Sequence, residues 1–405
     1  MHLKHLVLQN FRNHETFNFE FKDSQTVFVA LNGSGKTNIL EAIFLLATGE
    51  TFRDAKVEEL VRFEAEVAHI GCKVTENRGQ GTGDRKNIAS LELHTTLKLR
   101  TAQQNDNTIR HSGQSSDSLT DSESIQKDEE TELRATLTRG IWQGKRVAKK
   151  KYQVNGVPRS KAKFVGNFQV VSFRPEDLRI VEGSPGRRRK FLDQILIQID
   201  RQYAVALVTY GKALRQRNKL LEMIREQKTH PRALEYWDDL VIKHGTYINQ
   251  RRQELIEAFN SDQVSGLSGQ NFEYEMVYDH SMISRERLDR YKDRELGAGH
   301  TLVGPHRDDF QINGQVADGG EKQDLAKYGS RGQQRMCVLW LKIQALEFMN
   351  QQTKAQPILL LDDIFSELDH QHRELVFSLM QKYQTIATTA DQHYVEGVEA
   401  RVVNF

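Results

Sequence analysis

One segment near the N-terminus constrains the possible fold more than any other. Residues 27–30 (VFVA) are a short apolar stretch typical of a strand, and residues 31–37 (LNGSGKT) are a glycine-rich loop ending in Lys-Thr. Residues 38–46 (NILEAIFLL) have the composition of a buried helix. Strand, glycine loop, Lys-Thr and helix in this order are the context of a P-loop, where backbone N–H groups face phosphate oxygens. The segment therefore predicts an α/β fold that binds a nucleotide phosphate.

The residue types in this loop suggest individual roles. Lys36 would reach the β- and γ-phosphates as a catalytic residue, and Thr37 would place its hydroxyl on Mg²⁺. The loop departs from the usual pattern at Ala30, where a glycine is expected. Alanine fits there if φ stays negative, because a positive φ would cost about 1 kcal/mol or more. The predicted nucleotide-binding residues are Ala30, Leu31, Asn32, Gly33, Ser34, Gly35, Lys36, Thr37 and Asn38.

A second half of the site is indicated near the C-terminus. Residues 357–369 (PILLLDDIFSELD) begin with an apolar run without alternation, which is typical of a parallel strand buried on both faces. Two carboxylates follow at the C-terminal end of this strand, where ligands bind in α/β sheets. We expect Asp362 to hold Mg²⁺ and Asp363 to polarise the water that attacks the γ-phosphate.

A third motif lies between these halves, at residues 327–336 (KYGSRGQQRM), and an apolar helical segment follows it. The Ser-x-Gly-Gln pattern at a helix start, just before an acidic strand, resembles the signature of ABC-type ATPase heads. The resemblance implies that Ser330, Gly332 and Gln333 of one copy close over the γ-phosphate held by the P-loop of another copy. It therefore implies an ATP-dependent homodimer. The alternative is that Ser330 is an ordinary helix N-cap with Gln333 in the first turn of the helix.

Further motifs narrow the resemblance. Residues 6–13 (LVLQNFRN), 172–178 (SFRPEDL), 183–193 (GSPGRRRKFLD) and 302–309 (LVGPHRDD) look like the SMC-like branch and, within it, the RecF family of bacterial recombination mediators. The resemblance implies ATP and Mg²⁺ as cofactors and places Arg12 near the nucleotide. It also implies a cytoplasmic protein of DNA replication, repair and the SOS response that binds RecR and acts with RecO and RecA at gaps and stalled forks.

The resemblance also implies a mechanism. ATP would close a dimer on duplex DNA near single-strand gaps, and slow, DNA-dependent hydrolysis would release it. ABC transporters have a glutamate after the Mg²⁺ aspartate, whereas this chain has Asp363. The shorter side chain would lie about 1.5 Å further from the water, and such a misplacement can cost about 10²-fold in rate. Weak ATPase activity that acts as a switch is the expected result.

The organisation of the chain fits an ABC-type P-loop ATPase head with a mixed β-sheet and an inserted, mainly helical lobe. We expect the N-terminal half of the head over 1–180, the lobe over 181–295 and the C-terminal half of the head over 296–405. Residues 101–132 contain eight acidic and two basic residues and few apolar ones, which predicts a disordered insertion. Alternating patterns over 90–99 and 131–137 predict strands on either side of it.

Two basic segments are candidate DNA contacts. Residues 139–163 contain nine Lys or Arg and no acidic residue, with an Asn155-Gly156 hairpin signal, and both surface decoration and DNA contact remain open. Residues 185–232 have twelve Lys or Arg against four acids, a balance of +8, and helical spacing that Pro231 interrupts. A second helical pattern over 233–256 follows after a short break, so the two are expected to form an antiparallel pair. Solvated helix faces are the alternative to DNA binding over 185–232. The predicted DNA contacts are Arg187, Arg188, Arg189, Lys190, Arg215, Arg217 and Lys219.

The motif over 302–309 supports two interpretations. Arg307 contacts DNA or nucleotide across the dimer in one, and it forms an ion pair with a neighbouring aspartate in the other. The cluster Asp308-Asp309 is too small for a two-metal nuclease site.

Several classes of protein are disfavoured. With only Cys72 and Cys337, the chain lacks a disulfide framework and a metal knuckle. No apolar run approaches the roughly 18 residues of a membrane span, and the N-terminus lacks a signal pattern. An ABC transporter subunit would need the missing glutamate and a switch histidine, and an SMC structural protein would need a long coiled coil. Another SMC-like DNA-repair ATPase is the closer alternative.

Overall fold

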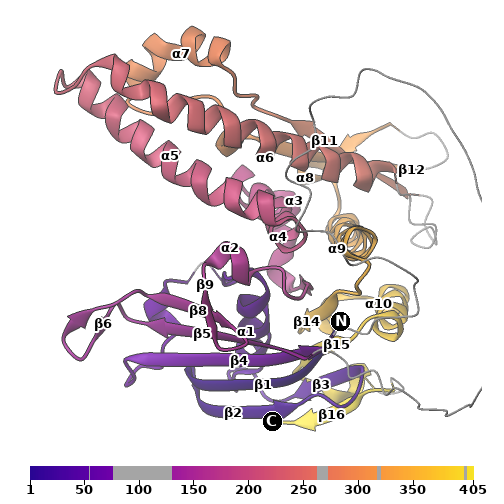
Figure 1. Cartoon of the computed structure of the whole chain (residues 1–405). Coiled ribbons are helices and arrows are strands. Elements are labelled where there is room, and N and C mark those ends of the chain that lie inside the picture. Colours follow the sequence, from indigo (N-terminus) through magenta and orange to yellow (C-terminus); the bar gives the residue numbers. More distant parts are fainter. Residues whose placement is uncertain (54, 76–129, 262–271, 317–320, 396–398) are drawn as a thin grey trace, which may run out of the picture. The chain divides into compact units, whose positions relative to one another are not determined.

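The computed structural model describes residues 1–53, 55–75, 130–261, 272–316, 321–395 and 399–405 (Figure 1). The predicted strand over 90–99 and nearly all of the acidic segment 101–132 lie outside the described residues. The strand predicted over 131–137 is present as β5 (Glu130–Thr138). Residues 130–132 therefore belong to a strand, which corrects the predicted end of the insertion.

The first sheet is antiparallel and has the order β2-β1-β4-β5-β8-β9. Its strands alternate, so that one face carries buried side chains such as Leu6 and Leu8 while the intervening Val7 is exposed. The turn between the last two strands has positive φ at both Asn155 and Gly156, as the sequence predicted. The strands are β1 (His2–Phe11), β2 (His14–Glu20), β4 (Val67–Thr75), β5, β8 (Lys150–Val154) and β9 (Val157–Arg159).

The second sheet is entirely parallel and has the order β10-β14-β15-β3-β16. Its inner strand β14, which lies between β10 and β15, is buried on both faces: Ile358 and Leu360 face one hydrophobic core, and Leu359 and Leu361 face another. The strands are β10 (Val170–Phe173), β14 (Ile358–Asp362), β15 (Thr385–Thr389), β3 (Gln25–Val29) and β16 (Arg401–Asn404). The predicted α/β head is present, with its strands divided between a parallel and an antiparallel sheet.

Helix α1 (Lys36–Thr48) packs against both sheets. Its apolar residues from Ile39 to Ala47 are at most 2% exposed and share one core with strands of each sheet. A helix that is apolar on all sides is stable only when it is buried on all sides. This burial fixes the helix N-terminus, and with it the glycine-rich loop, relative to the end of β14.

The inserted lobe is built on two long antiparallel helices, α5 (Arg201–Arg225) and α6 (Glu235–Ser261), as predicted (Figure 1). Helix α4 (Pro185–Ile199) precedes them, and α7 (Arg285–Ala298) packs against α5. Strand β11 (Phe272–Asp279) pairs with β12 (Asp309–Val316), which pairs with β13 (Gln323–Asp324). This small sheet joins segments on both sides of residue 295, where the sequence placed the end of the lobe, and the domain bounds stay a prediction.

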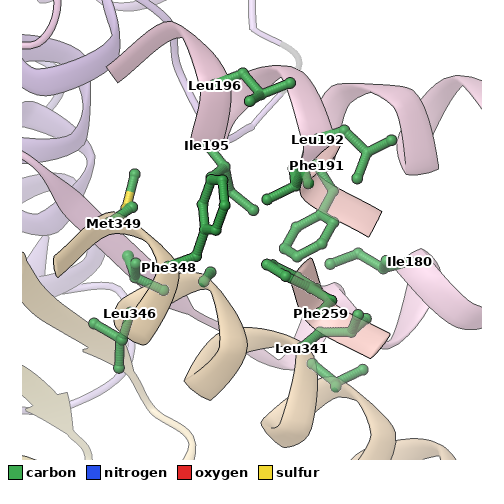
Figure 2. Close-up of a cluster of buried hydrophobic side chains, with 14 of the residues drawn as sticks. Ile180, Phe191, Leu192, Ile195, Leu196, Phe259, Leu341, Leu346, Phe348 and Met349 are labelled. Atoms are coloured by element: carbon green, nitrogen blue, oxygen red, sulfur yellow. The ribbon is translucent and has the colours of Figure 1, made fainter. Parts of the chain in front are cut away.

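The lobe and the helix after the signature share a hydrophobic core. Figure 2 shows Phe191 and Ile195 of α4 and Phe259 of α6 against Phe348 and Leu341 of α9 (Arg331–Thr353). Fully burying a side chain of this size stabilises a fold by about 1.5–3 kcal/mol. The signature helix is thus fixed to the lobe as well as to the head.

The remaining described elements are short or peripheral. They are η1 (Val57–Glu59), β6 (Ile141–Trp142), β7 (Lys145–Arg146), α2 (Lys161–Phe164), η2 (Pro175–Leu178), α3 (Arg179–Glu182), η3 (Pro231–Leu234), η4 (Pro305–Arg307), α8 (Leu325–Tyr328), η5 (Phe365–Glu367), α10 (His370–Lys382) and η6 (Gln392–Val395).

Candidate nucleotide-binding site

The loop between β3 and α1 has the backbone that a P-loop requires. Gly33 and Gly35 have φ values of 85° and 108°, which side-chain-bearing residues rarely adopt. A Cβ on Gly35 would also lie 2.5 Å from the side-chain amide of Asn13. Helix α1 begins at Lys36, directly after this turn, so its N-terminus opens into the loop.

Ala30 fits its position without strain. It is not among the residues with positive φ, and its N–H donates to the Thr389 carbonyl at 3.3 Å. An alanine was expected to fit here only if its φ is negative, and this requirement is met.

Lys36 is folded onto its own loop. Its Nζ donates to the carbonyl of Leu31 at 3.0 Å and also to that of Ala30, and the residue is 6% exposed. Burial lowers the pKa of Lys36, while the nearby carboxylates of Asp363 and Asp362 oppose this effect. The ammonium therefore has carbonyl partners that phosphate oxygens can replace.

The two predicted Mg²⁺ ligands are in direct contact. The Thr37 hydroxyl donates to Asp362 Oδ1 at 2.8 Å, although the residues are 325 positions apart. The Thr388 hydroxyl donates to the same oxygen at 2.8 Å. Asp362 is 7% exposed; burial raises its pKa, and the two hydroxyl bonds oppose the rise. A hydroxyl and a carboxylate side by side at the P-loop fit Mg²⁺, which takes oxygen ligands.

Asp363 has an unusual backbone. Its φ is 52°, its N–H donates to the Thr388 carbonyl at 3.0 Å, and its Oδ1 accepts from the Ala390 N–H at 3.4 Å. A positive φ in a residue other than glycine is sparsely populated and persists where the surroundings impose it, often at functional sites. The side chain is thereby directed to the ends of β14 and β15, beside Lys36. The Asp363 carboxylate raises the pKa of Lys36 and so opposes the effect of burial.

The turn between β1 and β2 braces the P-loop, and sequence reasoning did not assign this role. The Asn13 side chain donates to the Ser34 carbonyl at 2.9 Å and accepts from the Asn38 amide at 2.7 Å. His14 Nε2 lies 3.2 Å from the Gly35 carbonyl, to which it donates as the Nε2–H tautomer. Asn13 follows directly on the Asn-Phe-Arg motif of residues 10–12. This position in the sequence was the signal that could have predicted its contact with the P-loop.

Arg12, predicted at the nucleotide, forms a bidentate ion pair in this structure. Its Nε and Nη2 donate to the two carboxylate oxygens of Glu41 at 2.9 Å each, and its Nη1 donates to the Glu59 carbonyl at 3.1 Å. Glu41 belongs to the first turns of α1, so Arg12 lies beside the P-loop helix. Its contact with a nucleotide stays a prediction. Arg53, which was not assigned, donates to the Asn38 side chain at 3.0 Å.

The signature forms the exposed N-terminus of α9. The Ser330 hydroxyl accepts from the Gln333 N–H at 3.3 Å, and the Gln333 side chain accepts from the Ser330 N–H at 2.8 Å. This is a complete capping box. Ser330 and Gly332 are exposed. Ion pairs of Arg331 with Glu182 and of Arg335 with Glu367 hold this helix start against η5 and the lobe.

The predicted DNA contacts on α4 and α5 fall into two groups. Arg215 and Lys219 are exposed, and Arg187 and Lys190 are half-buried. Arg217, in contrast, is 2% exposed, with Nε 2.7 Å from Asp238 and Nη2 2.7 Å from Glu295. The prediction for Arg217 is wrong, because an interior guanidinium cannot reach a DNA backbone.

Two further arginines of α4 are engaged internally. Arg188 forms a bidentate pair with Asp309 at 2.6 and 2.8 Å, and Arg189 donates to the Asp308 carbonyl at 2.6 Å. In the same motif, Asp308 is fully buried and pairs with Arg252 at 2.9 Å. The ion-pair interpretation of Arg307 is therefore wrong, since the aspartates bind other arginines, and Arg307 itself is exposed.

None of the helices described is long and apolar enough to cross a membrane. Across the described residues, no group of three or more His, Cys, Asp or Glu is arranged to hold a metal ion. The latter does not concern the Mg²⁺ position, which Thr37 and Asp362 would share with phosphate and water.

Comparisons with known proteins show the family of this chain. The family model described as RecF/RecN/SMC N terminal domain matches residues 2–404. A DNA replication and repair protein RecF from Lachnoclostridium phytofermentans is 32% identical over 96% of this chain and 92% of its own length. One from Bacillus cytotoxicus is 31% identical over 98% and 94%. A solved structure of the recombination mediator RecF with ATPrS superposes with a TM-score of 0.76 at 28% identity, covering 98% and 94%. A RecF–ATP structure gives 0.76 at 27% identity, covering 98% and 93%.

Proposed function

The chain belongs to the RecF/RecN/SMC family, and from this premise we propose that it is an ATP-dependent DNA-binding protein of recombinational repair. The relatives named DNA replication and repair proteins, and the RecF structures titled with ATP or ATPrS, support both parts of the proposal. Another SMC-like DNA-repair ATPase is the alternative.

The nucleotide site supports ATP binding through the residues of this chain. Backbone N–H groups of 33–37 and the α1 N-terminus provide donors for the phosphates. Lys36 would exchange the carbonyls of Ala30 and Leu31 for the β- and γ-phosphate oxygens. Thr37 and Asp362 would hold Mg²⁺, which neutralises phosphate charge when it is bound.

One observation carries the proposal of an ATP-dependent homodimer. The P-loop and its acidic strand are already assembled within one chain, while the signature Ser330, Gly332 and Gln333 presents an exposed, capped helix start. Hydroxyl and N–H donors at a helix N-terminus suit the phosphate of a second copy. ATP would then join two copies, because its γ-phosphate binds the P-loop of one and the signature of the other.

Hydrolysis would time the release of DNA. Asp363 is the proposed group that polarises the attacking water, and its shorter side chain supports slow turnover. Loss of the γ-phosphate would remove the link between the two copies and let them separate from DNA. We expect the closed dimer to hold duplex DNA near single-strand gaps, without reading sequence, and to act with RecR, RecO and RecA in the cytoplasm.

Light scattering with and without ATP–Mg²⁺ tests the dimer. The wild type should be monomeric without nucleotide and dimeric with it, and Ser330→Arg should stay monomeric while binding ATP normally. Ser284, which caps α7, offers a matched control for the loss of a helix cap. Ser284→Arg should dimerise like the wild type. A wild type that binds ATP yet stays monomeric would refute the switch.

A further inference from the structure

The short hairpin formed by β6 and β7 combines exposed hydrophobic and basic residues in a way that the nucleotide site does not explain. It lies between the paired strands β5 and β8 and continues their ribbon (Figure 1). On β6, Ile141 is 57% exposed and Trp142 is 48% exposed. Their cross-strand partners on β7 are Arg146 and Lys145. Each exposed apolar side chain therefore stands next to a cation.

The hairpin is held firmly at its base. The Thr138 N–H donates to the Lys149 carbonyl at 3.0 Å, and the Val147 N–H donates to the Gly140 carbonyl at 3.1 Å. Arg139 Nη2 donates to the carbonyls of Arg62 at 3.0 Å and of Phe63 at 2.8 Å. A fixed base lowers the entropic cost of a contact made at the tip.

The tip itself is a tight two-residue turn. Gln143 and Gly144 have φ values of 49° and 74°, as in a type I′ turn, whose twist matches that of the flanking strands. Trp142 precedes the turn directly. Its ring is thus displayed at the end of a rigid ribbon rather than on a long loop.

The charged side chains of the hairpin itself are all basic, while one carboxylate reaches its tip from outside: Glu66 Oε2 accepts from the Gln143 N–H at 3.5 Å. Residues 139–163 contain no Asp or Glu. Among the described residues, the exposed side chains of five cations of this segment make no ion pair, which distinguishes them from Lys149, paired with Glu58. Of the five, Lys145 and Arg146 lie on the hairpin, while Lys151, Arg159 and Lys163 lie on β8, β9 and α2. Unpaired cations beside a displayed aromatic ring match the two parts of a nucleic acid, its phosphates and its bases.

We propose that this hairpin is a DNA contact in which Trp142 stacks on an unpaired base while Lys145 and Arg146 bind the adjoining phosphates. The proposal rests on the proposed DNA-binding function and assigns it a surface. An unpaired base is favoured over insertion into a duplex, because wedging a side chain between base pairs costs a few kcal/mol per step. Stacking on a base that is already exposed incurs no such cost. Among macromolecules, DNA is favoured over a protein because Lys145 and Arg146 form no ion pair among the described residues, and the nearby Glu66 carboxylate bonds a backbone N–H of the turn instead. Both cations are therefore available to phosphates.

The test uses the full chain with ATP–Mg²⁺ and two DNA probes, a blunt duplex and the same duplex with a single-stranded tail. Trp142→Ala should weaken binding of the tailed duplex by about 10- to 100-fold. Binding of the blunt duplex should change less than about twofold, since no unpaired base is offered. Trp142→Phe keeps an aromatic face and should retain most of the affinity.

Intrinsic fluorescence gives a second readout. The chain has three tryptophans; Trp340 is 4% exposed, and Trp237 is partly buried against the core. The tailed duplex should quench the wild-type emission, and the quenching should vanish in Trp142→Phe, which still binds. Tyr236, 65% exposed at the start of α6, is a matched control for removal of an exposed aromatic residue. Tyr236→Ala should bind both probes like the wild type.

The outcomes separate the two proposals. A wild type that binds neither probe, with or without ATP, refutes the proposed function. A wild type that binds both probes, with Trp142→Ala binding them equally well, refutes the hairpin contact and leaves a protein-binding role for the tip. A Trp142→Ala variant weakened equally on both probes refutes base stacking and assigns Trp142 to the duplex instead.

Discussion

The two basic regions of this protein have the same sign of charge but differ in what their charges do. On α4 and α5, Arg188 and Arg217 bind carboxylates inside the fold. On the β6–β7 hairpin, Lys145 and Arg146 have no carboxylate partner within the described structure and face solvent. A count of basic residues therefore does not distinguish cations that stabilise a fold from cations that are available to a polyanion. The two kinds are distinguished by whether a carboxylate lies within ion-pair distance of the cation.

The largest expected effect is the loss of stability on replacing the buried arginine of α5. Arg217→Met should lower the free energy of unfolding by about 3–5 kcal/mol, because it leaves Glu295 buried without its partner and removes one of the ion pairs of Asp238. Urea unfolding measures it. Arg215→Met, on the exposed face of the same helix, should change stability by less than about 0.5 kcal/mol. Equal losses of stability at the two positions would show that the buried ion pairs of Arg217 do not stabilise the fold more than an exposed arginine does.

A second prediction concerns pH and the same interior network. Burial lowers the pKa of His306 to about 4; its Nδ1 accepts from the Tyr210 hydroxyl at 2.7 Å and its Nε2–H donates to the Thr301 carbonyl at 3.1 Å. The unfolded chain takes up a proton near pH 6.5 and the folded chain only near pH 4, so this contribution is present above pH 6.5 and is lost as pH falls toward 4.

The expected size is about 2 kcal/mol between pH 7 and pH 5. Unfolding of the wild type and of His306→Gln should be compared across this window. The variant can be less stable at every pH, but its stability should fall less steeply with acid. Parallel curves for the two proteins would show that His306 is not held neutral by the fold.

The smallest effect on stability is expected on the hairpin. Replacing Lys145 and Arg146 together by Gln should change the free energy of unfolding by less than about 0.5 kcal/mol, since both are exposed and neither forms an ion pair with a described residue. If both bind phosphates of a single strand, the slope of log affinity against log salt should become shallower by about 1.4. Titration of the tailed duplex at several salt concentrations measures it. An unchanged slope would remove the hairpin from the DNA-binding surface.

Much of the geometry of the candidate nucleotide site could be predicted from the sequence. The glycine loop and the acidic strand end are strong local patterns, and the contact of Thr37 with Asp362 across 325 positions follows from the way such motifs meet in a parallel sheet. The bracing of the loop by Asn13 was missed, because a side chain bonded to a backbone carbonyl leaves no periodic pattern.

The basic helices could not be resolved in the same way. Arg217 lies among other cations on α5, and its partners Asp238 and Glu295 belong to α6 and α7. Which cation of a helix turns inward depends on where those distant carboxylates pack. The pairing of β11 with β12 could not be predicted for a similar reason, since it joins segments on both sides of residue 295.

The central claim is a composite site in which one copy supplies the P-loop and the other the signature. ATP hydrolysis by mixtures of Lys36→Ala and Ser330→Arg tests it most directly. Each variant alone should be inactive. A mixed dimer has one intact site, formed by the P-loop of the Ser330→Arg copy and the signature of the Lys36→Ala copy, so activity should reappear and peak at equal amounts. Mixtures no more active than either variant alone, beside an active wild type, would contradict the account.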